Sequence, residues 1–131
     1  MDDLSEQVAT LSRQGLCCAQ IVMKIVGLDL RQEENPDLVR AMGALCYGLH
    51  DQRSCGALTG GACSLALHAE DRAQMKMYLN DLLGWFEGEY GSTECSVILG
   101  EGSAPTSLCR EIVANTVGRC LTMLDGATWE S

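Results

Sequence analysis

Cysteine is the residue whose number and placement set this sequence apart, because thiols carry out redox chemistry and bind soft metals. The 131-residue chain contains eight of them: Cys17, Cys18, Cys46, Cys55, Cys63, Cys95, Cys109 and Cys120. In a secreted protein this number indicates a disulfide framework, whereas in the reducing cytoplasm it favours metal binding or thiol chemistry. A single buried cysteine is often only a small apolar side chain. That explanation is weak for all eight together.

The composition indicates where these thiols work. Apolar residues make up 47% of the chain, which argues for a folded domain, and the formal net charge of -9 argues against nucleic acid or an anionic membrane as partner. No apolar run approaches the length that spans a bilayer. The first residues, Met1 to Leu4, lack the basic and apolar regions of a signal peptide. We therefore expect a cytoplasmic protein with no membrane insertion.

Helices must position the thiols, because apolar residues recur at helical spacing and strict alternation is absent. We expect an all-α, single-domain bundle of about five to seven helices over residues 1–131, with a core from about 4 to 125 and a loose tail at 126–131. The first two helices should end near Gly15 and Gly27. The third should begin at Asn35-Pro36-Asp37, a typical helix start. Its buried stripe is predicted to be Leu38, Met42, Leu45 and Leu49.

A glycine-rich segment follows this helix. Ser54 is expected to cap a helix from Cys55 to about Ala69, although its glycines weaken it by propensity. Small residues four apart are tolerated where another backbone packs closely, so we place this helix at the centre of the bundle. The caps expected for the three later helices are Asp71, Ser92 and Thr106, and the first two of these helices should end at Gly91 and Gly100.

Five cysteines fall at predicted helix starts. Cys17 and Cys18 open the second helix, and Cys55 directly follows the cap of the glycine-rich helix. Cys95 and Cys109 each stand three residues after a hydroxyl cap. The first turn of a helix presents free N–H groups and the positive end of the dipole, and both favour thiolate over thiol. We therefore expect Cys18, Cys55, Cys95 and Cys109 to meet at one pocket, with at least one pKa well below about 8.5.

The other candidates have simpler explanations. Cys46, Cys63 and Cys120 are expected to pack in the core, with Cys120 outside the thiol pocket. His50 and His68 could be metal ligands, but a lone histidine at a helix end more often faces water or bonds a carbonyl. The chain has no C-x-x-C, no H-E-x-x-H and no phosphate-binding loop. The local motifs therefore leave redox chemistry and metal binding both open.

Several of these segments form a known pattern. The pieces, in chain order, are Gly15-Leu16-Cys17-Cys18-Ala19-Gln20, Cys55-Gly56-Ala57-Leu58-Thr59-Gly60, Gly91-Ser92-Thr93-Glu94-Cys95 with Leu99-Gly100, and Cys109. With them the chain resembles the C_GCAxxG_C_C family of redox-active proteins over nearly its whole length. The resemblance implies that Cys18, Cys55, Cys95 and Cys109 are the functional thiols. Similar members usually carry Asn where this chain has Cys17, which makes Cys17 an additional candidate.

The first hypothesis is a redox protein that uses these four thiols for thiol–disulfide or electron handling with an unidentified partner protein. The alternative is a metal or iron–sulfur protein with the same four ligands, and Cys17 as a fifth candidate, because a cation would relieve the repulsion among packed thiolates. A third is an interaction protein whose cysteines only pack. The sequence names no cofactor beyond this metal ion or cluster, does not decide whether the protein is an enzyme, and is compatible with a homo-oligomer.

Overall fold

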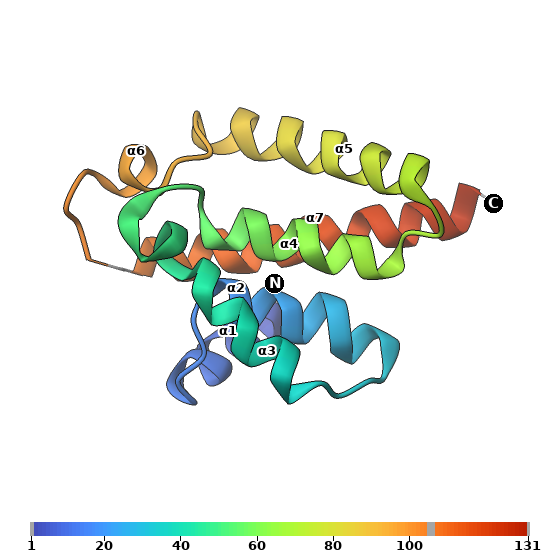
Figure 1. The fold of residues 1–131 in the computed structure, drawn as a ribbon, viewed down its shortest axis with the longest axis horizontal. Helices are drawn as coiled ribbons and strands as arrows, with labels where there is room; N and C mark the ends of the chain where they lie inside the picture. The colour runs from blue at the N-terminus through green and yellow to red at the C-terminus, as the bar shows by residue number, and fades with distance from the viewer. Residues whose placement is uncertain (1, 105–106, 131) are drawn as a thin grey trace.

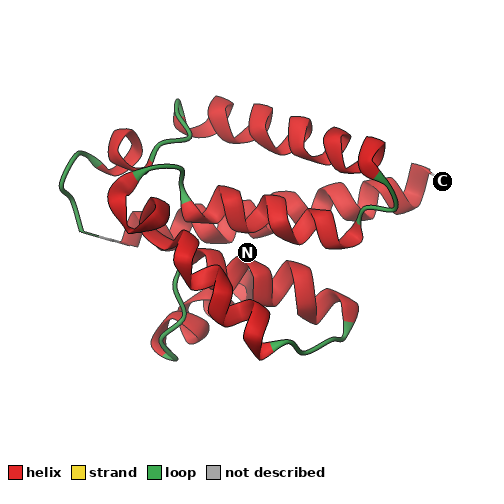
Figure 2. Cartoon of the chain, viewed as in Figure 1, coloured by secondary structure: helices red, strands yellow, loops and turns green. Residues whose placement is uncertain are grey.

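The computed structural model describes residues 2–104 and 107–130, with side chains placed for residues 3–104 and 107–125. Within these ranges the chain forms seven α-helices and no strand, which confirms the predicted all-α class (Figure 2). The α-helices are α1 (Asp2–Arg13), α2 (Cys18–Val22), α3 (Pro36–Met42), α4 (Gly56–His68), α5 (Arg72–Tyr90), α6 (Cys95–Leu99) and α7 (Ser107–Glu130). Shorter π or 3-10 segments are η1 (Met23–Leu28), η2 (Asp29–Arg31), η3 (Gly43–Leu45) and η4 (Gly48–Gln52).

Helix α4 lies at the centre of the bundle, as the glycine-rich sequence predicted. It packs against α2 and η1, against α5, and against α7. In Figure 1, α4 and α7 run through the middle, with α5 on one side and α1 to α3 on the other. The core side chains that meet around α4 are apolar, and among the fully buried ones are Leu65, Leu82, Phe86 and Val117. Their burial supplies the main driving force for this arrangement.

Two neighbouring glycines allow the helices to approach α4 closely. A Cβ atom added at Gly60 would lie 2.9 Å from both the Cα and the carbonyl oxygen of Ala19, so α2 touches α4 at the backbone. A Cβ at Gly61 would lie 3.3 Å from the Cys120 sulfur and 3.3 Å from Leu82. Close helix packing is therefore confirmed as the structural function of these glycines.

Three predicted helix ends are confirmed. The Asn35 side chain accepts a hydrogen bond from the Leu38 N–H at 3.1 Å, and Asp71 accepts one from the Gln74 N–H at 2.8 Å. Gly91 ends α5 in the left-handed conformation, with φ of 76°.

Two predicted caps are wrong. Helix α4 has Cys55 rather than Ser54 at its N-cap, because Ser54 instead forms a bridge with Glu94. Ser92 accepts a hydrogen bond from the Glu94 N–H, but α6 begins only at Cys95.

The last helix extends further than the sequence predicted. Its expected cap, Thr106, lies outside the described residues. The backbone of α7 stays helical to Glu130, through residues assigned to a loose tail after Gly126. The single-domain assignment stays a prediction. In the part of the chain that the structure describes, no helix combines the length and apolarity needed to cross a bilayer.

The third predicted helix stops early. Helix α3 ends at Met42 and continues only as the short segment η3, so Leu49 does not join the buried stripe and is 57% exposed. The chain then reverses through residues with positive φ: Tyr47 at 55°, Gly48 at 61°, Leu49 at 60°, His50 at 60° and Gln52 at 54°. Each non-glycine residue in this left-handed turn costs about 1–2 kcal/mol. Contacts elsewhere must hold the turn in place.

Candidate thiol site

Six of the eight cysteines line one cavity of about 480 Å³. Its other walls are mostly apolar and include Leu16, Ile21, Ile112 and Val113, while His50 and Arg110 contribute polar groups. A volume of this size is typical of a small-molecule site. The cysteines comprise the four predicted thiols and two more: Cys18, Cys55, Cys95 and Cys109, with Cys17 and Cys46.

Four helix starts bring the cysteines together. Cys17 is the N-cap of α2 and Cys18 its first residue, while Cys55 is the N-cap of α4. Cys95 is the first residue of α6, and Cys109 is the third residue of α7. The predicted positions at helix starts and the shared pocket are therefore confirmed. That these residues are redox thiols stays a prediction.

Backbone hydrogen bonds join two of these helix starts directly. The Cys55 N–H donates to the Thr93 carbonyl at 2.8 Å, and the Cys95 N–H donates to the Arg53 carbonyl at 2.7 Å. The segments before α4 and before α6 therefore run side by side. This pairing holds Cys55 and Cys95 at the same end of the bundle without help from their side chains.

Gly56, the glycine of the Cys-Gly-Ala motif, makes room for a thiol. A Cβ atom there would contact the Cys18 sulfur, and it would lie 2.9 Å from the Leu45 carbonyl oxygen and 3.2 Å from the Cys46 Cα. The Cys18 sulfur and the Cys46 backbone therefore both lie against Gly56, where there is no side chain. A larger residue at this position would displace either the thiol or the backbone before Cys46.

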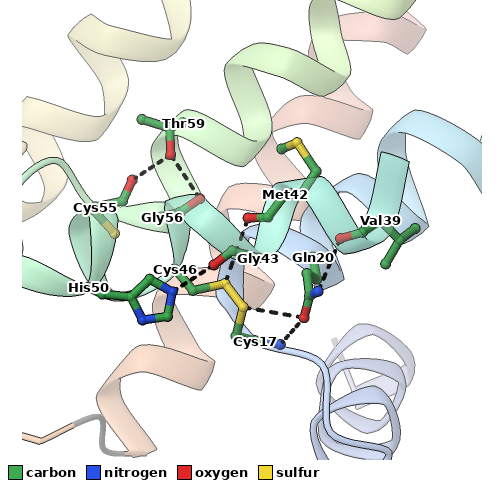
Figure 3. The surroundings of a disulfide bond; sticks show 10 residues. All are labelled: Cys17, Gln20, Val39, Met42, Gly43, Cys46, His50, Cys55, Gly56 and Thr59. Carbon is green, nitrogen blue, oxygen red and sulfur yellow. Dashed lines mark hydrogen bonds between the residues drawn. A yellow bond between two sulfur atoms is a disulfide. The ribbon is translucent and has the colours of Figure 1, made fainter. Parts of the chain in front are cut away.

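Cys17 and Cys46 form a disulfide, with their Cα atoms 6.0 Å apart (Figure 3). This separation is normal for such a bond. The expectation that Cys46 only packs in the core is therefore wrong, although its side chain is buried. Cys18, the neighbour of Cys17 in the sequence, is a free thiol.

Gln20 connects this disulfide to helix α3. Its amide oxygen accepts a hydrogen bond from the Cys17 N–H at 3.0 Å and lies 3.3 Å from the Cys17 sulfur. Its amide nitrogen donates to the Val39 carbonyl at 3.0 Å (Figure 3). The function of Gln20 is not evident from the motif that contains it. Its spacing of three residues from an N-cap is the signal of a capping box.

The left-handed turn after Cys46 is tied to the loop between α6 and α7. The Gln52 side chain donates to the Gly100 carbonyl at 2.9 Å and accepts from the Gly102 N–H at 2.6 Å. The Tyr47 hydroxyl donates to the Ser103 carbonyl. These bonds compensate the strain of the turn. They also fix the loop that follows Cys95 and precedes Cys109, a function of Gln52 and Tyr47 that sequence analysis missed.

The expected lowering of thiol pKa is wrong for three of the four predicted thiols. Burial raises the pKa of Cys55 from 9.0 to about 11 and also raises the pKa values of Cys18 and Cys95. Backbone N–H groups at the start of α4 lower the pKa of Cys55, and those of Tyr47 and Ala19 lower the pKa of Cys18, but by less than burial raises them. Loss of water around the thiolate therefore outweighs the favourable position at a helix start.

Among the described residues, no three His, Cys, Asp or Glu side chains are arranged so that they could hold a metal ion. Both histidines instead contact carbonyls, as expected: His50 Nε2 lies 2.8 Å from the Gly43 oxygen, and His68 Nε2 lies 2.8 Å from the Val26 oxygen.

The two remaining cysteines lie outside the cavity. Cys120 is fully buried in the core beside Gly61, which confirms its expected packing function. Cys63 is exposed, so the expectation that it packs in the core is wrong.

Replacing Cys120 by Ala should therefore lower the free energy of unfolding by about 1–2 kcal/mol, because it removes a buried sulfur atom. Urea denaturation measures this change. The matched change Cys63→Ala should stay within about 0.5 kcal/mol, since its side chain is exposed. A Cys120→Ala protein that lost reversible thiol chemistry while remaining folded would contradict a purely structural function for Cys120.

One comparison with known proteins identifies a family. A family model described as "Putative redox-active protein (C_GCAxxG_C_C)" matches residues 16–123, which is most of the chain and includes all six cysteines of the cavity. No curated protein and no solved structure matches the chain.

Proposed function

Since the chain belongs to the C_GCAxxG_C_C family, we propose that it is a redox protein that works by thiol–disulfide exchange in the cysteine-lined cavity. The observation that carries this proposal is the presence of a disulfide and free thiols in one cavity. Cys17–Cys46 is the oxidised pair. The reduced thiols beside it are Cys18, Cys55, Cys95 and Cys109.

The expected cytoplasmic location favours a redox-active Cys17–Cys46 disulfide over a structural one. Disulfides in cytoplasmic proteins are usually transient, catalytic or redox-sensing. The mostly apolar walls partly bury the cavity thiols. The same burial keeps Cys18, Cys55 and Cys95 protonated at neutral pH, since it raises their pKa values. The attacking thiolate is therefore expected to come from an external dithiol.

The reaction follows the usual two-step exchange. A thiolate of the external dithiol attacks one sulfur of the Cys17–Cys46 bond, a mixed disulfide forms, and the other cysteine leaves as a thiolate and takes up a proton. The second thiol of the partner then attacks the mixed disulfide. The partner loses two electrons and two protons and becomes a disulfide, while Cys17 and Cys46 become thiols.

Reversible reduction under native conditions is the direct test. Treatment of the folded protein with dithiothreitol should raise the number of titratable thiols, counted after rapid unfolding, from six to eight per chain. Oxidised glutathione should then return the number to six. Mass spectrometry of peptides should assign the change to Cys17 and Cys46. Circular dichroism before and after reduction checks that the helices persist.

Two variants and a metal analysis separate thiol–disulfide exchange from a structural disulfide and from metal binding. Cys46→Ser should abolish the cycle, because it removes one partner of the disulfide, whereas Cys63→Ser, which changes an exposed thiol outside the cavity, should keep it. A bond that resists reduction until the protein unfolds would mean a structural disulfide and would overturn the proposal. Stoichiometric metal in anaerobically purified protein, lost on Cys55→Ser, would favour the metal-binding alternative instead.

A further inference from the structure

The contacts of Gln20 extend the proposed function. We propose that Gln20 is a positioning residue for Cys17: its amide oxygen accepts the Cys17 S–H when the Cys17–Cys46 bond is reduced, and it thereby helps to set the equilibrium between disulfide and dithiol. The inference rests on the proposed function, since it assumes that this bond is reduced and re-formed in the folded protein.

The orientation of the Gln20 amide is fixed by two hydrogen bonds. Its nitrogen must face the Val39 carbonyl, an acceptor 3.0 Å away, and its oxygen must face the Cys17 N–H, a donor 3.0 Å away. Packing restricts it further, because a Cβ atom at Gly43 would lie 3.1 Å from the amide nitrogen. The amide oxygen is therefore the atom held 3.3 Å from the Cys17 sulfur.

The contact between the Gln20 oxygen and the Cys17 sulfur differs between the two redox states of Cys17. In the disulfide the Cys17 sulfur carries no proton, so the oxygen and sulfur are only in contact. Reduction adds a proton to the sulfur, which then has an acceptor already in place at hydrogen-bond distance. The same oxygen disfavours a thiolate, because its partial negative charge faces the sulfur. Gln20 therefore stabilises the reduced, protonated form of Cys17 relative to the disulfide.

The simpler explanation is that Gln20 only completes the cap of α2. In a capping box the third helical residue is Glu or Gln, and its side chain accepts the N–H of the N-cap. This explanation predicts that Glu and Gln give the same redox equilibrium, because both supply the acceptor oxygen for the Cys17 N–H. Gln20→Glu and Gln20→Met both lose the hydrogen bond to the Val39 carbonyl, so that loss cannot shift the equilibrium in opposite directions. The redox explanation predicts that Glu and Gln differ, since a carboxylate is a stronger acceptor for the S–H and carries a full charge. Gln20→Glu therefore separates the two explanations.

The experiment is equilibration of the folded protein with glutathione redox buffers at a fixed neutral pH, followed by acid quenching and mass spectrometry of Cys17 and Cys46. Gln20→Glu should shift the equilibrium toward the dithiol by about fivefold, because a charge-assisted hydrogen bond replaces a neutral one. Gln20→Met should shift it toward the disulfide by about fivefold, because the acceptor is lost. The other polar side chains that line the cavity stay the same in every variant: Ser12, Cys18, Tyr47, His50, Cys55, Cys95, Cys109 and Arg110.

Helix α5 offers a matched control. Gln74 is the third residue of its helix, as Gln20 is in α2, and its amide oxygen accepts the Glu70 N–H at 2.7 Å. Gln74→Glu and Gln74→Met therefore change a helix start in the same way, but away from the cavity. Both should leave the glutathione equilibrium of Cys17 and Cys46 unchanged.

The outcomes separate the two proposals. If the wild-type bond does not equilibrate with glutathione, the proposed function fails. If the wild type equilibrates but both Gln20 variants match it, or both shift in the same direction, Gln20 only caps the helix and this inference fails. Opposite shifts for Gln20→Glu and Gln20→Met, with no shift for the Gln74 variants, would support it.

Discussion

Replacing Gly60 by Ala is expected to lower the free energy of unfolding by about 2–3 kcal/mol, a large part of the stability of a small domain. The added Cβ would lie 2.9 Å from the Cα and from the carbonyl oxygen of Ala19. Both are backbone atoms, which cannot turn aside as a flexible side chain can. Helix α2 would have to move away from α4, and this movement would cost more than Ala gains over Gly in helix propensity. Urea denaturation of the oxidised protein measures the loss.

Gly84 provides the matched control, because it also lies inside a helix but has nothing within 4 Å of its Cβ position. Gly84→Ala should raise the free energy of unfolding by up to about 1 kcal/mol, through helix propensity alone. Opposite signs for the two identical substitutions would show that the contact with α2, and not propensity, determines the effect at Gly60. A Gly60→Ala protein as stable as the wild type would refute backbone contact between α2 and α4.

Cys55 is expected to react about a hundredfold more slowly at pH 7 than an ordinary thiol on account of its pKa alone. Burial raises this pKa from 9.0 to about 11, so the fraction of thiolate at neutral pH falls by two powers of ten. Labelling by iodoacetamide, read at Cys55 by mass spectrometry, should increase about tenfold per pH unit and level off near pH 11. Limited access of iodoacetamide to the cavity lowers the labelling rate at every pH, but it does not change the pH at which half of Cys55 is thiolate.

The same protein in urea is the control. There Cys55 is solvated, and its labelling should level off near its ordinary pKa of 9.0. The folded state holds the Cys55 proton more tightly than the unfolded state. Its contribution to stability is therefore complete below pH 9 and is lost as the pH rises toward 11. A midpoint at or below pH 9 in the folded protein would contradict the dominance of burial and would restore the helix-start argument for a reactive thiolate.

The features that could be predicted from the sequence are those with a local cause. Asn35 and Asp71 cap their helices through their own side chains, and Gly91 ends a helix through its own backbone freedom. The cysteines at helix starts could also be identified, although Ser54 and Ser92, which indicated two of these starts, are not the caps in the structure. That they converge on one cavity depends on how α2, α4, α6 and α7 pack together, and only the structure shows it.

The features that could not be predicted have distant causes. Cys46 forms a disulfide with a residue 29 positions earlier, and nothing around either residue indicates the other. Leu45 and Leu49 continue the helical spacing of α3, although the chain has already left the helix. Of the consecutive left-handed residues 47–50, only Gly48 is of a type that favours this conformation.

The thiol pKa values are a further property that depends on residues distant in the sequence. Position at a helix start is a local property, and it correctly gives the direction in which N–H groups act on Cys55. The amount of water removed from the sulfur depends on every element that packs around the cavity, and this larger effect decides the result. The sequence therefore indicated the helix-start positions of Cys18, Cys55 and Cys95 but the wrong direction for the shift of their pKa values.

The Cys17–Cys46 bond has one more consequence, because it closes a loop that contains α2, η1 and α3. In the chain-entropy model a loop of this length stabilises the folded protein by roughly 3–4 kcal/mol, since it restricts the unfolded chain. By thermodynamic linkage, folding must favour the oxidised bond by the same amount. A dithiol that reduces the protein therefore also lowers its resistance to unfolding. The redox state of the Cys17–Cys46 pair and the lifetime of the protein against proteolysis are therefore linked.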